Sequence, residues 1–124
     1  MNANAMPGRP MGLCELPPMP MDEEERQKAL DDLRLLDTHH EERFDRIVRL
    51  AQTVFHTPIA YIALVDRNRQ WFKSKIGVTT DETTRDISFC GHTILQDGPL
   101  IVPDALQDYR FACNPMVVGE PFIR

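Results

Sequence analysis

The chain has 124 residues, of which 42% are hydrophobic and 27% charged, with 19 acidic against 14 basic side chains. This length suits one domain of ordinary size and argues against a two-domain enzyme. The net charge of −5 argues against nucleic-acid binding, which needs clustered lysine and arginine. The longest apolar run, Ile59–Val65, is too short to span a membrane, so we expect a soluble, cytoplasmic domain with no membrane segment.

Residues 1–21 differ in composition from the rest of the chain. They contain five prolines and five of the six methionines, without a helical or alternating apolar pattern. Because proline removes backbone donors and fixes φ, we predict a disordered leader over 1–21 and the domain over 22–124. Each methionine of the leader is a candidate for the true translation start: Met1, Met6, Met11, Met19 and Met21.

Two amphipathic helices are predicted next. Asp22 and Glu25 have the spacing of a capping box and open a helix of about four turns. Thr38 and Glu41 repeat this spacing and open a second helix that runs to about Phe55. Their apolar stripes favour packing against a sheet or another helix.

The strand pattern begins after the second helix. Ile59–Val65 is apolar at every position, which predicts a strand covered on both faces. Gln70–Ile76 is expected to form a hairpin with it, because the link between them is short. Thr79–Asp86 is polar and predicts a loop, and Leu100–Val102 predicts a third strand. These elements together indicate an α+β fold.

Two short helical segments are predicted in the remaining part of the chain. Ser88 is placed to cap a short helix that runs to about Leu95. Asp104–Tyr109 is expected to form one helical turn.

The segment from Arg85 to His92 is the main candidate for chemistry. Cys90 and His92 suggest a nucleophile and its base, since an imidazole lowers the pKa of a nearby thiol. Residues two apart on a helix point about 200° apart, so burial of Cys90 and an ordinary polar role for His92 are favoured. Neither these two residues nor His39 and His40 have the spacing of a structural zinc site, so no metal is expected.

The same segment allows two readings of its charged residues. Arg85 and Asp86 precede a helix that begins near Ser88, an arrangement that suits an anionic ligand. An ordinary ion pair that holds a loop is an equally good reading. Trp71 and Phe72 are adjacent in a strand and therefore face opposite sides, so one is expected in the core and the other beside a cavity.

Taken together, the motifs resemble those of a bacterial GAF domain, of the kind found before histidine kinase, diguanylate cyclase or phosphodiesterase domains. The resemblance covers about residues 22–124. It rests on these strings: Leu35-Leu-Asp-Thr38, Phe44-Asp-Arg-Ile47, Leu64-Val-Asp66, Arg69-Gln-Trp-Phe-Lys-Ser74, Arg85-Asp-Ile-Ser-Phe-Cys90-Gly-His92, Val102-Pro-Asp104, Asp108-Tyr-Arg-Phe111, Asn114-Pro115 and Gly119.

The resemblance implies an antiparallel sheet with helices on one face and a roofed pocket for a small ligand on the other. The roof falls on Arg85–Leu95 and the floor on Trp71 or Phe72. The implied ligand-binding residues are Trp71, Phe72, Arg85, Asp86, Ser88, Cys90 and His92. The ligand varies across the family, so the resemblance names no cofactor.

Family members continue beyond the segment that matches Phe122–Arg124, which implies a domain incomplete at its C-terminus. Ile59–Val65 would then lack a partner along one edge, and we expect marginal stability, aggregation or rescue by a partner chain. The implied function is a non-catalytic sensory module in two-component or cyclic di-GMP signalling, which binds a small molecule or forms a homodimer through its N-terminal helices.

Three alternatives stay open at this level. The chain is a gene fragment without independent activity, a GAF-type methionine sulfoxide reductase that uses Cys90 and Cys113, or a photoreceptor that carries a bilin on Cys90.

Overall fold

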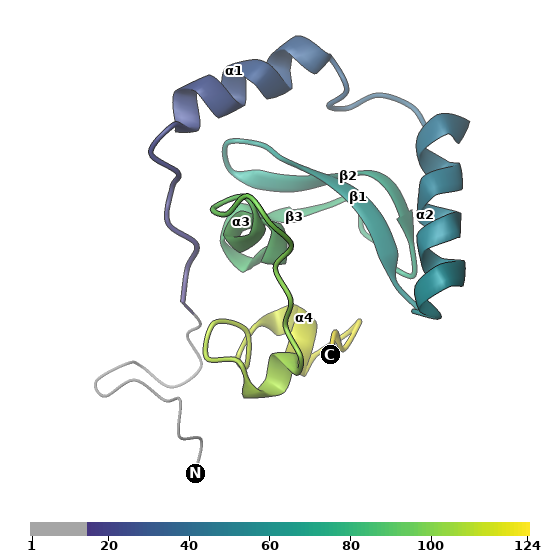
Figure 1. Cartoon of the computed structure of the whole chain (residues 1–124), viewed down its shortest axis with the longest axis vertical. Helices are drawn as coiled ribbons and strands as arrows, with labels where there is room; N and C mark the ends of the chain where they lie inside the picture. The colour runs from purple at the N-terminus through teal and green to yellow at the C-terminus, as the bar shows by residue number, and fades with distance from the viewer. Residues whose placement is uncertain (1–14) are drawn as a thin grey trace.

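The computed structural model describes residues 15–124, so the predicted leader up to residue 14, with the starts at Met1, Met6 and Met11, lies outside the described residues. Figure 1 shows the sheet with α1 and α2 around it and α3 and α4 below. The elements are α1 (Glu23–Leu33), α2 (Glu42–Phe55), β1 (Ala60–Val65), β2 (Arg69–Ile76), β3 (Glu82–Thr84), η1 (Arg85–Ile87), α3 (Phe89–Thr93), η2 (Ala105–Gln107) and α4 (Pro115–Val118).

The predicted α+β class and antiparallel hairpin are confirmed. The three strands form one antiparallel sheet in the order β1-β2-β3, and α2 packs against β1 and β2. Within residues 15–124, β1 is therefore an edge strand, with β2 on one side only. Its residues are half-buried except for Val65, which is buried, so the prediction that both faces of this strand are covered is wrong in part.

The third strand lies elsewhere than predicted. Glu82–Thr84, inside the predicted loop, pairs with β2 as β3. Leu100–Val102 has the composition of a strand but is assigned to no strand, and Ile101 is 77% exposed. A strand needs a partner for its backbone groups, and the described residues offer β2 a neighbour in β3 but offer Leu100–Val102 none.

Both predicted capping boxes are wrong. Asp22 precedes α1 without a side-chain cap, and α1 ends at Leu33, where Arg34 turns into the left-handed region. α2 begins only at Glu42, and Glu41 makes no cap bond. The second box fails because of Lys73 on β2, whose Nζ lies 2.7 Å from Thr38 Oγ1 and 2.7 Å from Glu41 Oε2. A buried ammonium thus occupies the two side chains expected to cap the helix.

A small cluster of buried apolar residues lies below the sheet. Ala105, Phe111 and Val117 are fully buried and join η2 to α4. Asp104 caps η2 and Asn114 caps α4 through their side chains, so the helical turn predicted near Asp104 is confirmed. Within the described part of the chain, no helix has the length and apolar character to cross a membrane.

Residues 15–21 have no helix or strand but lie against the domain. Pro17 contacts Gly91 on α3 so closely that a Cβ on Gly91 would lie 2.8 Å from Pro17 Cγ. The Glu23 amide donates to the Pro20 carbonyl at 3.2 Å, which joins this segment to α1. The predicted disorder of the leader over residues 1–14 lies outside the described residues and stays a prediction.

Candidate functional site

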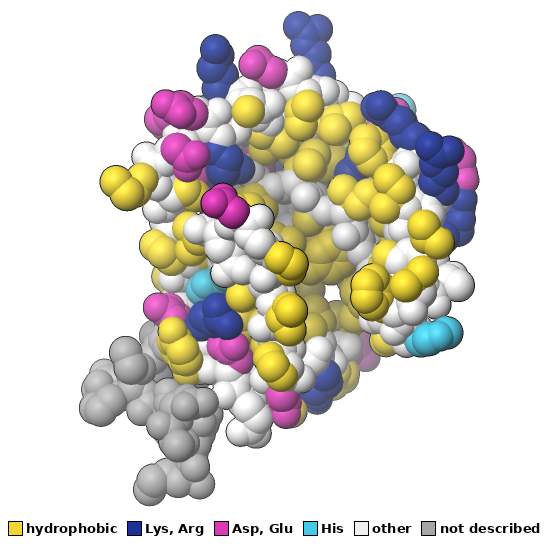
Figure 2. Space-filling model, viewed as in Figure 1, with side chains coloured by type: hydrophobic (Ala, Val, Ile, Leu, Met, Phe, Trp, Pro, Cys, Tyr) yellow, Lys and Arg dark blue, Asp and Glu magenta, His cyan; other side chains and the backbone are white. Residues whose placement is uncertain are grey.

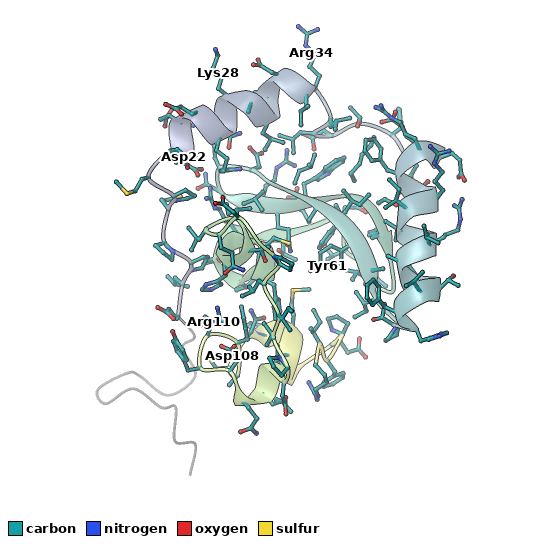
Figure 3. All side chains as sticks on the ribbon, viewed as in Figure 1. Asp22, Lys28, Arg34, Tyr61, Asp108 and Arg110 are labelled. Carbon is teal, nitrogen blue, oxygen red and sulfur yellow. The ribbon has the colours of Figure 1, made fainter. Side chains whose placement is uncertain are left out.

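An apolar cavity with several aromatic residues in its lining lies beside the first half of β1 and is called here the aromatic cavity. It has a volume of about 470 Å³ and is lined by residues 57–61, Phe89 and residues 121–124. Figure 2 shows a hollow in this face with hydrophobic side chains around it, and Figure 3 labels Tyr61 beside it. The volume falls within the range of small-molecule sites.

Three aromatic rings line this cavity, and two of them are backed by another ring. Phe89 stacks on Phe111 with ring centroids 4.2 Å apart, and Tyr61 lies against Phe72 with centroids 4.7 Å apart. Rings held in this way lose little freedom when a ligand binds. Phe72, predicted as a floor residue, therefore acts on the cavity through Tyr61.

The third ring belongs to Phe122, which separates the aromatic cavity from a neighbouring one. Phe122 lines both cavities, the second of about 450 Å³ between Gly77, Thr83 and Met116. Its φ of 58° lies in a region that bulky residues rarely adopt. The amides of Phe122 and Ile123 hold it there by donating to Gly119 at 2.7 Å and Met116 at 2.8 Å.

Cys90 lies on α3 and does not line the aromatic cavity, but its thiol shares a hydrogen bond with the hydroxyl of Tyr61, which does. Burial raises the pKa of Cys90 to about 11, and burial likewise raises the pKa of Tyr61. At neutral pH both groups are thus protonated. Cys90 also lines an open apolar cleft of about 600 Å³ between α1, the second half of β1 and α3.

His92 points to a different side of the domain from Cys90. Its ring contacts Phe111 edge-on at 5.1 Å and lines a cavity of about 190 Å³ with Glu15, Asp86, Ser88 and Arg110. Burial, and to a lesser degree Arg110, lower the pKa of His92, while contact with the Glu15 backbone opposes this. The nucleophile–base pairing of Cys90 with His92 is therefore not formed.

Arg85 is engaged inside the domain. Its guanidinium binds both carboxylate oxygens of Glu23 on α1, at 2.6 and 3.1 Å, and the carbonyls of Asp66 and Arg67 at 3.3 Å. The residue is buried, with 6% of its surface exposed. It fits the second reading of the sequence, an ion pair that holds a loop, rather than an anion site.

Ser88 and Asp86 also have local partners. Ser88 caps α3 as predicted: its hydroxyl donates to the Arg85 carbonyl at 2.6 Å and accepts from the Gly91 amide at 2.9 Å. Asp86 is exposed and accepts a hydrogen bond from Thr84 at 2.5 Å. Since α3 has only five residues and its cap is already made, it offers little to an anion.

Trp71 and Phe72 are both buried, in spite of the expectation that only one belongs to the core. The pairing passes from Ile62–Ser74 to Ala63–Phe72, which leaves Lys73 as an extra residue on β2. The bulge lies beyond Trp71 and Phe72, which pair in regular register with Leu64 and Ala63 and still alternate. Both are buried because both faces of β2 are covered over Gln70–Ser74. Both residues border a cavity of about 300 Å³ near Thr38 and Asp81, away from the aromatic cavity.

The predicted site residues thus lie around at least three cavities. Sequence reasoning missed Tyr61, Phe89 and Phe122. Tyr61 has a signal in hindsight, because a tyrosine within an otherwise aliphatic strand needs a partner for its hydroxyl. Among the described residues, no three histidine, cysteine or acidic side chains gather as metal ligands would.

Comparison with known families gives the fold a family. The model of the GAF domain matches residues 39–124, which is most of the chain. The chain belongs to the GAF domain family. In GAF terms, the matched region contains β1, α3 and the whole aromatic cavity, whereas α1 lies before it.

A curated protein is similar over nearly the same region. The chain is 46% identical over 108 residues to a protein named cyclic di-GMP phosphodiesterase PA2567, from Pseudomonas aeruginosa. The alignment covers 87% of this chain and 18% of that protein. The GAF chain thus spans about a fifth of the length of this relative.

Proposed function

We propose that this GAF domain is a sensory or regulatory module that binds a small molecule and is not catalytic by itself. The observation that carries the proposal is the aromatic cavity, whose walls are already in place around about 470 Å³. The similarity to a phosphodiesterase named for cyclic di-GMP supports a role in cyclic di-GMP signalling, with the catalytic step in another domain. A cytoplasmic location fits this role and stays a prediction.

The chemistry of Cys90 supports a non-catalytic role. A reductase or bilin-attaching cysteine works as a thiolate, and burial that raises the pKa of Cys90 to about 11 disfavours that form. His92 does not approach it to act as a base. We expect wild type and Cys90→Ser to be equally inactive in sulfoxide-dependent thiol oxidation, and both to stay colourless when produced with bilin. Reductase activity or colour that is present in wild type and absent from Cys90→Ser would contradict the proposal.

Ligand binding is tested by thermal unfolding of the purified chain with a panel of small aromatic and aliphatic compounds. A ligand that binds only the folded state raises the midpoint, by an amount that grows with concentration. We expect at least one aromatic compound to raise it in wild type, with a smaller effect in Phe122→Ala. A panel without any effect on wild type would count against a binding role.

A homodimer through the N-terminal helices is a second candidate function, supported by an apolar stripe on α2. Ile47, Leu50 and Val54 recur at three- and four-residue spacing, Phe55 follows at the end of the helix, and their exposed fractions are 51, 63, 60 and 77%. Figure 2 shows hydrophobic side chains exposed over α2. Such a stripe is typical of a helix that packs against another helix.

Light scattering tests the dimer. We propose that wild type and Thr53→Glu, whose side chain is exposed beside the stripe, have the mass of two chains. Leu50→Glu places a charge within the stripe and is expected to have the mass of one. A single-chain mass for wild type would exclude the dimer and leave ligand binding untouched.

A further inference from the structure

Cys113 is joined in a disulfide bond and lies directly before Asn114, the cap of α4. The chain has three cysteines, and Cys90 is a free thiol. Cys14 is therefore the one cysteine of the same chain that is left to pair with Cys113. Cys14 precedes the described residues and is bonded to Glu15, the first of them.

The first described residues bring the chain to Cys113. Glu15 and Leu16 line the cavity of about 190 Å³ on the His92 side of α3, and Cys113 lines the same cavity. Consecutive Cα atoms are about 3.8 Å apart, and the Cα atoms of a disulfide lie about 4.4–6.8 Å apart. A cysteine bonded to Glu15 is therefore well placed to reach Cys113 across this cavity.

Residues 15–21, called here the N-terminal segment, are held on the domain by separate weak contacts. The Glu15 backbone contacts His92, and Pro17 packs on Gly91 of α3. Figure 1 shows the segment running from α1 past α3. Because it contains no helix or strand, such a segment opens at low cost unless a covalent bond fixes its end.

We propose that Cys14 and Cys113 form a reversible disulfide that fixes the N-terminal segment across α3 when oxidised and releases it when reduced. The oxidant is a small-molecule disulfide. One cysteine thiolate attacks it, which forms a mixed disulfide and releases the first small thiol; the other cysteine then attacks the protein sulfur, which closes the internal bond and releases the second. Two electrons and two protons pass from the cysteines to the small disulfide, and an added dithiol reverses the exchange. In a reducing compartment such a bond is transient, as in redox sensors.

Release of the N-terminal segment would reach α1 and the residues before α3. The Pro20 carbonyl accepts from the Glu23 amide at 3.2 Å, and the Glu23 carboxylate binds Arg85 on η1 at 2.6 Å. The segment thus connects the disulfide to the charged groups that join α1 to the domain. Cys113 does not line the aromatic cavity, so this redox input goes beyond the proposed ligand binding and is independent of it.

Alkylation with N-ethylmaleimide in denaturant counts the free thiols of the full chain after incubation with oxidised glutathione or with dithiothreitol. We expect wild type to take one label when oxidised, on Cys90, and three when reduced. Cys90→Ser is the matched control and should take one label fewer in each state. Three labels on oxidised wild type, glutathione bound in place of the internal bond, or a disulfide between two chains would each overturn the inference.

Cleavage after Glu15 by a glutamate-specific protease measures the release of the N-terminal segment. We expect oxidised wild type to be cut at least about tenfold more slowly than reduced wild type, because cleavage needs a local opening that the bond prevents. Cys14→Ser changes none of the described residues and should be cut at the reduced rate under both conditions. Equal rates for oxidised and reduced wild type would overturn the inference and leave the proposed function standing.

Discussion

The region around Lys73 and Arg85 and the region around Tyr61 and Phe122 are stabilised in opposite ways. In the first, buried charged groups are matched by several partners each, and α1 and α2 are joined to the sheet through them. In the second, apolar rings pack against one another and leave a cavity. Charged groups with every partner in place make a rigid frame with no binding capacity left, whereas apolar walls with space between them can accept a ligand.

Replacing the buried lysine should have the largest effect. Lys73 has no exposed side-chain surface, and its Nζ bonds to Thr38, the His39 carbonyl at 2.5 Å and Glu41. Lys73→Met leaves the His39 carbonyl and Glu41 Oε2 without the donor they have in the wild type, so we expect a loss of about 2–4 kcal/mol in the free energy of unfolding. Lys28→Met on the exposed face of α1 is the control, with a change within about 0.5 kcal/mol. Equal urea midpoints for the two variants would mean that the buried Lys73 contributes no more to stability than an exposed lysine does.

Adding a methyl group at Gly91, where α3 contacts the N-terminal segment, should have the next largest effect. A Cβ on Gly91 would lie 2.8 Å from Pro17 and 2.9 Å from Ser88 Oγ, the cap of α3, whereas a Cβ on Gly98 would meet nothing within 4 Å. We expect Gly91→Ala to cost about 1–2 kcal/mol and Gly98→Ala to be nearly neutral. In limited proteolysis, Gly91→Ala should be cut faster near residues 15–20. Unchanged cleavage would show that Pro17 does not rest on α3.

The ion pairs of Glu23 should make stability depend on pH. Hydrogen bonds from Arg26, and then from Arg85, lower the pKa of Glu23 far below its usual range. Because the pKa of Glu23 is lower in the folded than in the unfolded state, its ion pairs stabilise the folded protein fully at pH values above the unfolded pKa of about 4.3. This contribution is lost as the pH falls below that value toward the folded pKa. We expect thermal midpoints to fall below about pH 5, and Glu23→Gln to fall less steeply over the same range. Parallel curves for the two proteins would contradict this assignment.

The smallest effect is expected in the apolar region. Tyr61→Phe removes one hydrogen bond, with Cys90, and keeps the ring that faces the cavity. We predict a loss of about 0.5–1 kcal/mol in thermal unfolding and no change in the affinity for 2-naphthol, one of the aromatic compounds of the thermal-unfolding panel. A large loss of stability would show that this region also depends on its polar contacts.

The fold was predictable where the pattern is local. The apolar period of α2, the short link between β1 and β2 and the cap at Ser88 all depend on residues close in sequence. The start of α1 after Asp22 was predictable, whereas the start of α2 was not, because Lys73 binds Thr38 and Glu41 from a distant position in the chain. The burial of both Trp71 and Phe72 was not predictable either, because it depends on what covers the two faces of β2.

The site was less predictable than the fold. The resemblance placed the roof near α3, but Arg85, Ser88 and His92 are engaged by partners that no local pattern reveals. Tyr61, Phe89 and Phe122 are distant in sequence and are brought together only by the packing of β1, α3 and the residues after α4. Such a convergence follows from tertiary contacts alone.

Hydrogen exchange with and without 2-naphthol tests the central claim most directly. The account predicts that the compound slows exchange in residues 57–61, around Phe89 and in residues 116–124, and leaves α1 and the amides near Arg85 unchanged. Slower exchange near His92 and Arg110 instead, or no change anywhere at saturating 2-naphthol, would contradict the claim that the aromatic cavity is the binding site.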